Sequence, residues 1–296
     1  MKILFMGTPD YAEIILNSLI NKYEIVGVYT QPDKPVGRKK IITPSPVKVL
    51  ATKHNIKVFQ PNNLKNEKEN IKKLNPDFIV VAAFGMILPK NILDIAPCIN
   101  LHASLLPKYR GASPIQSAIL NGDKLSGITA MKMDIGLDTG DILSYEYCEV
   151  GNKTAPELFD ELAKIAANLT PFVIDNYKKI KPLKQIDTIA SYSPKIKKEN
   201  GEIIFDDANK IYRKYLAFYY WPGIFTKKFK LKKIDLVDKV SLNIPGEVLE
   251  IKKQSIIVGC QKGSIEVFEI QPHSKKPMNV ISYLNGRGLK VGDNLL

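Results

Sequence analysis

The sequence has few of the residues that metalloenzymes and serine hydrolases require. Its 296 residues include only three histidines, three cysteines and one tryptophan. Neither an H-E-x-x-H pattern nor a clustered set of histidines and cysteines is present, which argues against metal catalysis. The G-x-S-x-G elbow of α/β-hydrolases is also missing, and Ser104 lies too near His102 in sequence to be a persuasive nucleophile.

Long apolar runs and paired cysteines are missing too. No run approaches the ~20 apolar residues of a membrane-spanning helix. The N-terminal Met-Lys-Ile-Leu-Phe-Met-Gly has too short an apolar part for a signal peptide, and it predicts a first strand instead. The cysteines are far apart and have no C-x-x-C spacing, which predicts buried thiols in a reducing cytoplasm rather than disulfides or a zinc site.

Acidic residues are in short supply. The chain has 43 lysines and arginines against 30 acidic residues, a net charge of +13. A solvated basic surface is one explanation, but this surplus favours a polyanionic partner, nucleic acid ahead of membrane because no basic amphipathic helix stands out. Residues 205–296 alone carry sixteen basic against nine acidic residues, so more than half of the excess lies in the last third.

The first part of the chain has the rhythm of a parallel α/β sheet. An apolar run at 2–6, helical spacing at 11–20 and a second apolar run at 24–30 predict strand, helix and strand. Because residues 7–10 read G-T-P-D rather than G-x-G-x-x-G, we expect a Rossmann-like, mostly parallel sheet without a dinucleotide. Residues 77–83 predict a buried strand, which ends at a glycine turn where such sheets bind ligands.

We predict three parts in the chain. Residues 1–177 form the α/β catalytic domain, residues 178–204 a lysine-rich linker, and residues 205–296 a smaller OB-like β-barrel domain. Further expected strands of the first domain lie at 57–60, 98–102, 127–134 and 141–149, with helices at 46–53, 64–74, 114–121 and 154–177. The second domain is expected to have a helix at 206–217 and strands at 224–231, 246–251, 256–260 and 264–270.

Residues 31–46 stand apart because they contain four prolines, one glycine and several basic residues. This composition predicts an irregular loop, longer than usual connections in compact α/β units. A solvated flexible loop is the simplest interpretation. Prolines restrict the backbone, however, so the segment could also serve as a stiff basic arm for a phosphate backbone.

Asn100, His102 and Asp138 are the candidate catalytic residues. Asn100 and His102 are two apart on a predicted strand, so both side chains leave the same face and could hold a developing oxyanion. Asp138 lies in a glycine-punctuated loop, residues 133–141, that could return a carboxylate to the imidazole. With no protein nucleophile in evidence, we expect one substrate to supply it.

Several motifs together resemble those of the methionyl-tRNA formyltransferases. They are G-T-P-x-x-A at 7–12, Q-P-D-K-P-x-G-R at 31–38, N-x-H-x-S-L-L-P at 100–107, Y-R-G-A-x-P at 109–114, M-D-x-G-L-D-T-G-D at 133–141, W-P-G at 221–223 and N-G-R-G-L at 285–289. The resemblance covers essentially the whole chain. The Asn-His-Asp trio is shared by the wider folate-dependent formyltransferases, whereas the basic arm and the C-terminal barrel are more specific.

The resemblance implies that 10-formyltetrahydrofolate donates a formyl group to the α-amino group of methionine on initiator tRNA, with no metal. Asn100 and His102 would stabilise the oxyanion, and Asp138 would orient or deprotonate, directly or through water. The implied folate-binding residues are Ser104, Leu105, Leu106, Pro107, Phe84, Gly85, Met86, Ile87 and Leu88. The implied tRNA-binding residues are Lys34, Arg38, Lys39 and Lys40. A cytoplasmic monomer without membrane contact is expected.

Three alternatives remain open at this point. The acceptor could be a small amine, such as a nucleotide sugar or glycinamide ribonucleotide, although neither the basic arm nor the charged barrel is needed for one. The trio alone would also suit a 10-formyltetrahydrofolate hydrolase or dehydrogenase. Finally, the chain could be a nucleic-acid-binding module on an inactive scaffold, and folate binding without turnover would favour that hypothesis.

Overall fold

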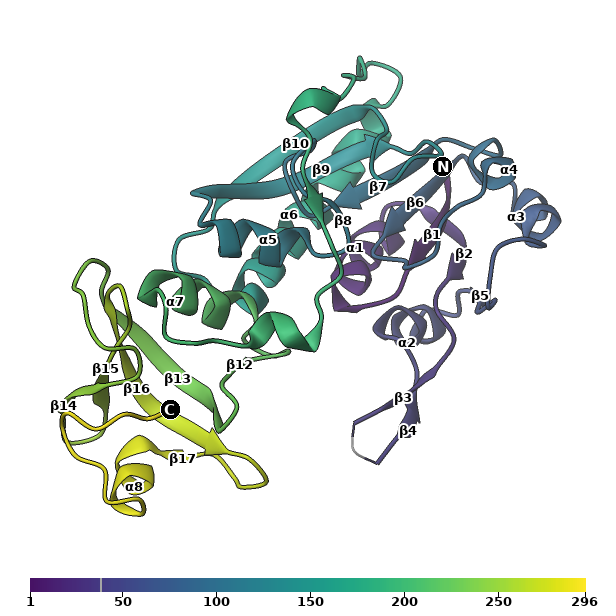
Figure 1. The fold of residues 1–296 in the computed structure, drawn as a ribbon. Helices are drawn as coiled ribbons and strands as arrows, with labels where there is room; N and C mark the ends of the chain where they lie inside the picture. The colour runs from purple at the N-terminus through teal and green to yellow at the C-terminus, as the bar shows by residue number, and fades with distance from the viewer. Residues whose placement is uncertain (38) are drawn as a thin grey trace. The chain divides into compact units, whose positions relative to one another are not determined.

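The computed structural model describes residues 1–37 and 39–296, which divide into two compact units (Figure 1). The first unit contains residues 1–114, 125–149 and 159–194, and the second contains 115–124, 150–158 and 195–296. A mostly parallel α/β sheet forms the first unit and an antiparallel sheet the second, so the predicted fold class is confirmed. The predicted domain limits at residues 177 and 205 stay a prediction.

A seven-stranded sheet forms the centre of the first unit, in the order β10-β9-β7-β6-β1-β2-β5. Strands β5, β2, β1, β6 and β7 pair in parallel, whereas β9 and β10 run antiparallel at one edge. Their bounds are β1 Lys2–Gly7, β2 Glu24–Tyr29, β5 Val58–Phe59, β6 Phe78–Ala82, β7 Cys98–His102, β9 Leu125–Lys132 and β10 Ile142–Glu149.

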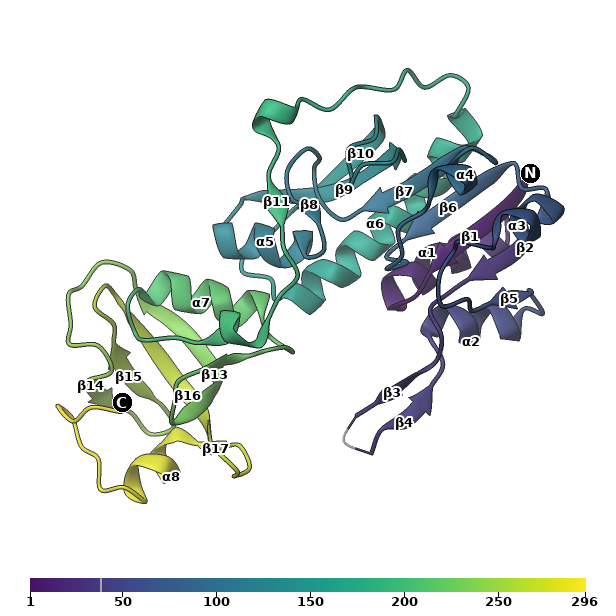
Figure 2. The same cartoon turned by 45° about the vertical axis from the view of Figure 1, so that its right-hand side comes forward.

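Helices cover both faces of this sheet because alternate residues of each buried strand point in opposite directions. Leu4 and Ile79 share one apolar cluster with Ile71 of α3 and Ile92 of α4. Helices α1 and α6 lie on the other face (Figure 2). There the Tyr11 ring of α1 packs against Phe159 of α6, with ring centroids 5.7 Å apart. The bounds of the helices of this unit are α1 Asp10–Ile20, α2 Pro46–Lys53, α3 Lys68–Leu74, α4 Lys90–Leu93 and α6 Ala155–Asn176, the last with its first turn in the second unit; α5 Pro114–Asn121 belongs to the second unit apart from Pro114.

The N-termini of two helices, α6 and α3, can be compared with those predicted from the sequence. One half of the capping box predicted before α6 is present, because the Glu157 carboxylate accepts from the Thr154 backbone N at 2.8 Å, and it also accepts from the Thr154 hydroxyl at 2.7 Å. The helix predicted at 64–74 begins only at Lys68, so that prediction was wrong at its start. Each helix in the described part of the chain is too short or too polar to cross a bilayer.

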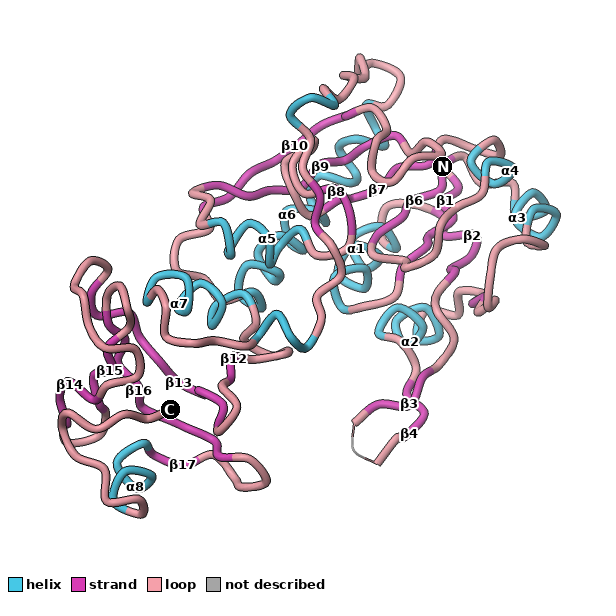
Figure 3. Tube along the Cα trace, viewed as in Figure 1, coloured by secondary structure: helices cyan, strands magenta, loops and turns pink. Residues whose placement is uncertain are grey.

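The basic segment 31–46 is more regular than predicted. Strands β3 (Lys34–Val36) and β4 (Ile41–Thr43) pair antiparallel as a two-stranded ribbon, so the prediction of a wholly irregular loop was wrong (Figure 3). Both strands of an isolated ribbon are edge strands, and an edge strand tolerates proline because the missing N–H can face outward. Pro35 sits within β3 in this way, opposite Ile42.

The second unit is built on the antiparallel sheet β12-β13-β16-β15-β14, with β17 paired to β16. Its strands are β12 Ile224–Phe225, β13 Phe229–Asp238, β14 Val248–Ile251, β15 Ile256–Gly259, β16 Ser264–Pro272 and β17 Met278–Asn279, with helices α7 Ala208–Ala217 and α8 Val280–Asn285. The single strand predicted at 224–231 is wrong. A turn in which Thr226 N donates to Phe229 O (2.8 Å) separates β12 from β13.

The segment after α6 contains short elements that the sequence did not predict. Strand β11 (Tyr192–Ser193) pairs in parallel with β8 (Arg110–Gly111), next to the predicted catalytic residues. Leu183 exchanges two backbone hydrogen bonds of 2.8 Å with Ile142 of β10. We call residues 183–193 the strap, because both of its ends are tied to the first unit.

Candidate active site

Strand β7 places Asn100 and His102 on the same face of the sheet, near its own carboxyl end. The strand lies between β6 and β9, with Asn100 opposite Val81 on one side and Met131 on the other. The His102 side chain is buried, and Asn100 is half-buried. Their spacing of two and the pairing on both sides of β7 therefore fix where the amide and the imidazole point.

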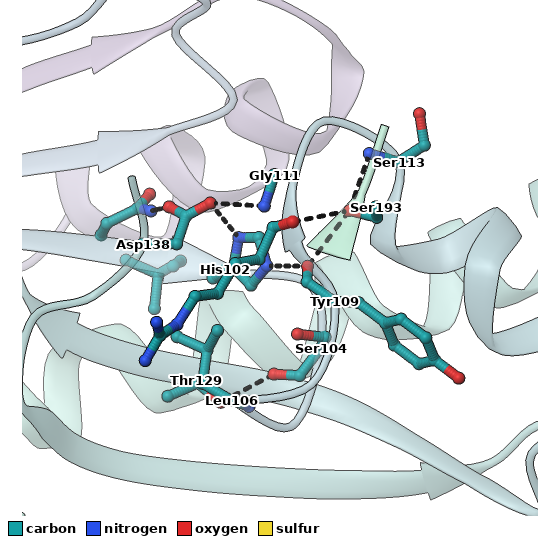
Figure 4. Close-up of polar contacts among 12 residues, drawn as sticks. His102, Ser104, Leu106, Tyr109, Gly111, Ser113, Thr129, Asp138 and Ser193 are labelled. Carbon is teal, nitrogen blue, oxygen red and sulfur yellow. Dashed lines mark hydrogen bonds and ion pairs between the residues drawn. The ribbon is translucent and has the colours of Figure 1, made fainter. Parts of the chain in front are cut away.

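Asp138 reaches these two residues from the loop between β9 and β10 (Figure 4). Its Oδ1 lies 3.4 Å from Asn100 Nδ2, and its Oδ2 lies 3.7 Å from His102 Nδ1. The same Oδ2 accepts a 2.8 Å hydrogen bond from the Gly111 backbone N. Asp138 has φ +54°, a left-handed conformation that aspartate tolerates better than most residues. The structure thus brings the three predicted catalytic residues together.

The imidazole of His102 is oriented by a backbone carbonyl. Its Nε2 lies 2.9 Å from Tyr109 O, which also accepts a 3.1 Å hydrogen bond from the Ser193 hydroxyl (Figure 4). Since a carbonyl oxygen can only accept, Nε2 carries the hydrogen of this contact. Nδ1 is therefore the nitrogen that faces Asp138, and it carries a hydrogen only when the ring is an imidazolium.

A reacting group could replace the contacts within the trio. The contacts of Asp138 with Asn100 and His102 are longer than good hydrogen bonds, whereas its backbone contact with Gly111 is short. A substrate can replace such long contacts without breaking strong ones, and catalytic contacts often shorten only when substrate binds. An amide, an imidazole and a carboxylate in one place can together hold an oxyanion and move a proton.

Two of the residues implied for folate binding hold their loop together. The Ser104 side chain is buried and its hydroxyl donates to Lys108 O at 2.5 Å. Leu106 N donates to Thr129 Oγ1 (3.0 Å), and that hydroxyl donates in turn to Ser104 O at 2.7 Å. Leu106 itself is buried in a small apolar cluster, while Leu105 and Pro107 are half-buried. The side chains of Ser104 and Leu106 thus shape this loop from inside.

The other implied folate residues, Phe84–Leu88, follow β6. Phe84 and Leu88 are buried in the apolar cluster beneath the sheet, and Met86 packs against that cluster. Gly85 is exposed, and Ile87 is 85% exposed. Two further apolar side chains, Ile135 and Leu137, are exposed on the loop that carries Asp138. Loops beside the catalytic trio therefore offer three uncovered apolar side chains to a flat, partly apolar ligand.

Lys34, Lys39 and Lys40, implied for tRNA binding, are all exposed on the basic ribbon. Arg38, the fourth of these residues, lies outside the described part of the chain. The ribbon is fastened at its base by Asp33, which accepts hydrogen bonds from Lys48 Nζ (2.6 Å) and Gln60 Nε2 (2.7 Å). The Gln60 and Lys48 contacts lower the pKa of the Asp33 carboxyl, so this anchor is charged at neutral pH.

Four supporting residues were missed by the sequence reading. Thr129 stands opposite His102 in the β7–β9 register, and this could have been found once that pairing was assumed. Ser191, Ser193 and Gln185 belong to the strap, whose composition predicts only a linker. Ser191 Oγ accepts from Tyr109 N at 2.9 Å. No sequence periodicity marks the strap, because its strand β11 is two residues long.

Arg110 is a buried charge inside this scaffold. Its side chain is 2% exposed, and Nη2 lies 2.8 Å from Asp187 Oδ1. Burial alone would lower the pKa of Arg110, but its hydrogen bonds to Asp187 and Tyr192 and the charges of these two groups together outweigh burial, so the pKa lies above its usual value. The next residue must be glycine: Gly111 has φ +116°, and a Cβ there would lie 2.6 Å from Ser193 O.

Comparison with known proteins places the chain among formyl transferases. The formyl transferase family profile matches residues 1–174, and the profile of the formyl transferase C-terminal domain matches residues 195–288. A curated protein from a Nitratiruptor species, named methionyl-tRNA formyltransferase, is 55% identical over 299 residues and 99% of each chain is covered.

Solved structures agree with this. A methionyl-tRNA formyltransferase from Clostridium thermocellum has a TM-score of 0.56 and 25% identity, covering 88% of this chain and all of that one. An N-formyltransferase from Helicobacter canadensis, solved with folinic acid and dTDP-3-aminofucose, has a TM-score of 0.70 at 20% identity, covering 92% and 100%. The second similarity supports the fold alone.

No group of three or more metal-ligating side chains occurs among residues 1–37 and 39–296.

Proposed function

The chain belongs to the formyl transferase family, and we propose that it transfers the formyl group of 10-formyltetrahydrofolate to the α-amino group of methionyl initiator tRNA. Curated relatives with that name match the chain over its full length at about half of all positions, which supports this acceptor. The observation that carries the reaction type is the convergence of Asn100, His102 and Asp138.

The catalytic steps follow from the atoms that face the site. The amine nitrogen of methionine attacks the formyl carbon, and the carbonyl oxygen becomes an oxyanion. Asn100 Nδ2 and the protonated Nδ1 of His102 stabilise that charge, while Asp138 balances the imidazolium. The C–N10 bond then breaks; the amine loses one proton and N10 of the folate gains one, so the reaction is proton-neutral. Asp138 accepts the amine proton, directly or through water.

The folate co-substrate fits the loops that flank the trio. Ile87, Ile135 and Leu137 are exposed there, and apolar side chains of this kind bind one face of a flat heterocycle. Ser104, Leu105, Leu106 and Pro107 form the opposite loop, with Gly85 and Met86 beside Ile87. Because Phe84 and Leu88 are buried in the core, we propose that they support the folate loop and do not touch the ligand.

We propose that the basic ribbon binds the acceptor end of the tRNA. Lys34, Lys39 and Lys40 are exposed on it, as are the apolar side chains of Val36 and Ile41. Cations neutralise phosphates, and aliphatic side chains can pack against the apolar faces of unpaired bases at a single-stranded end.

The second unit adds further basic and aromatic surface. A hollow of about 240 Å³ is bordered by Lys198, Lys227, Lys230 and His273. Tyr220 and Trp221 are 81% and 57% exposed, and the Tyr220 ring packs edge-to-face against Tyr219. These features suit backbone and base contacts with RNA. We further propose that the enzyme acts in the cytoplasm and that it is a monomer. Light scattering on the purified protein would test the oligomeric state.

The deciding experiment is a formylation assay with 10-formyltetrahydrofolate and charged initiator tRNA, followed by release and detection of formyl-methionine. Free methionine and a charged elongator tRNA serve as comparison acceptors. The proposal predicts formyl-methionine from initiator tRNA. No product at saturating levels of both substrates would refute it, and turnover of a small amino sugar instead would favour the small-amine alternative.

A further inference from the structure

We propose that Gln185 is a positioning residue for formyl transfer. Its side-chain amide joins the loop that carries Asp138 to the loop that orients His102, and so fixes the geometry of the catalytic pair. Gln185 is half-buried in the strap and lies outside the motifs that define the trio. The inference rests on the proposed function, because its main readout is the rate of that reaction.

The amide of Gln185 uses every hydrogen-bonding position that it has. Its Nε2 donates to Asp138 O and to Gly140 O, both at 2.8 Å. Its Oε1 accepts from Arg110 Nε and Nη2, at 3.0 and 2.9 Å. Two backbone carbonyls can only accept and a guanidinium can only donate, so the orientation of the amide is unambiguous. Four good partners hold the side chain in one place.

The two sides of this amide lead to the two halves of the catalytic pair. On one side are the carbonyls of Asp138 and Gly140, in the loop that supplies the carboxylate. On the other side is Arg110, whose neighbours in the chain hold the pair directly: Tyr109 O contacts His102 Nε2, and Gly111 N donates to Asp138 Oδ2. Gln185 therefore bridges both elements that set the distance between imidazole and carboxylate.

The Asp138 loop depends on such a support. Asp138 itself is held in a left-handed conformation, and a Cβ at Gly140 would lie 1.8 Å from Lys132 O, so the loop is tightly folded against β9. Without the two carbonyl contacts, the loop keeps its internal hydrogen bonds to Asp134 Oδ1, and Asp138 keeps the Gly111 hydrogen bond and its long contacts with Asn100 and His102. A displacement of about 1 Å at reacting groups can lower a rate about 10²-fold.

The discriminating variant is Gln185→Glu. A glutamate keeps two oxygens for Arg110, so the buried guanidinium retains its partner, but it cannot donate to the carbonyls of Asp138 and Gly140. We expect kcat for formyl transfer to fall about 10- to 10²-fold, with KM for folate and for tRNA within about twofold of wild type. Gln185→Met, which has a similar length and no hydrogen bonds, should show the same loss of kcat.

Two further measurements separate positioning from folding. Amide hydrogen exchange in residues 136–140 should quicken in Gln185→Glu while the melting temperature stays close to that of wild type. Asn176→Asp is the matched control, since Asn176 Nδ2 also donates to a backbone carbonyl, Phe172 O at 2.9 Å, at an exposed site on α6. That variant should keep wild-type kcat.

The outcomes are distinct. Wild-type protein without formyl transfer would refute the proposed function and not the role of Gln185, because loop exchange would still respond to Gln185→Glu. Active wild type with an unchanged kcat in Gln185→Glu would overturn the inference. So would a loss of kcat that merely follows loss of folded protein, or failure of both Gln185 variants to fold, since Gln185 would then be a stability residue.

Discussion

Asp138→Asn is the sharpest test of the catalytic trio, because the substitution changes charge and hydrogen-bonding pattern but hardly any volume. The amide oxygen of the new side chain can still accept from Gly111 N, which is the short contact of the present carboxylate. The amide NH₂ then faces Asn100 Nδ2, so two donors meet where a donor and an acceptor meet now. The protonated ring of His102 also loses its counter-charge.

The size of the effect follows from the 3.7 Å between His102 Nδ1 and Asp138 Oδ2. Two unit charges at that distance attract by about 4.5 kcal/mol at an effective dielectric constant of ~20, and each 1.4 kcal/mol is a factor of ten in rate. The two side chains are 7% and 12% exposed, so solvent screens part of this attraction. We expect kcat to fall about 10²- to 10³-fold, with little change in KM.

Single-turnover formylation of charged initiator tRNA, with enzyme in excess over tRNA, measures this loss at the chemical step. Asp134→Asn is the control: Asp134 Oδ1 accepts from Gly136 N (3.0 Å) and Thr139 Oγ1 (2.7 Å), and an amide oxygen can keep both contacts. A kcat within about threefold of wild type in Asp138→Asn would remove Asp138 from proton transfer and from stabilising the imidazolium.

Three further predictions concern other residues. Asn100→Ala should lower kcat about 10²- to 10³-fold, since it removes one oxyanion donor; an effect confined to KM in the same assay would contradict this. Arg38→Ala should raise KM for tRNA and leave KM for folate unchanged, and a lower salt dependence of tRNA binding would accompany it. Burial raises the pKa of Cys98 to about 12 from its ordinary value of 9.0, so the unfolded chain releases this proton first. Between about pH 9 and 12 the free energy of unfolding should therefore fall by up to about 1.4 kcal/mol per pH unit from this thiol, and urea titrations of wild type and Cys98→Ala would show the difference.

Much of the first unit could be predicted because its strands are buried on both faces. Continuous apolar runs predict such strands well, and the bounds of β7 agree with the predicted 98–102. Asn100 and His102 could be placed together by strand periodicity alone. Asp138 could be placed near them because the loop that carries it is short. That loop follows β9, which pairs antiparallel with β7 and so keeps the loop close to β7.

What could not be predicted depends on contacts distant in sequence. All six residues of β3 and β4 are exposed. Neither strand therefore has a buried face, and the sequence shows no alternation of apolar and polar residues from which the pairing could be predicted. The strap is held by the side chains of Gln185, Ser191 and Ser193, each hydrogen-bonded to residues 45–84 positions away. Such contacts arise only after the sheet has formed, and neither the composition nor the periodicity of the strap points to them.

The strap also bears on how this two-unit architecture can change over evolution. Connections between domains usually accept insertions and deletions freely, because few contacts cross them. Here the connection's first half, up to Pro194, belongs to the first unit, and residues 183–193 run beside the catalytic loops. We therefore expect length changes in this connection to be tolerated beyond Pro194 and not within the strap. Descendants of this chain that exchange residues 195–296 for another domain would have to keep the strap with the catalytic sheet.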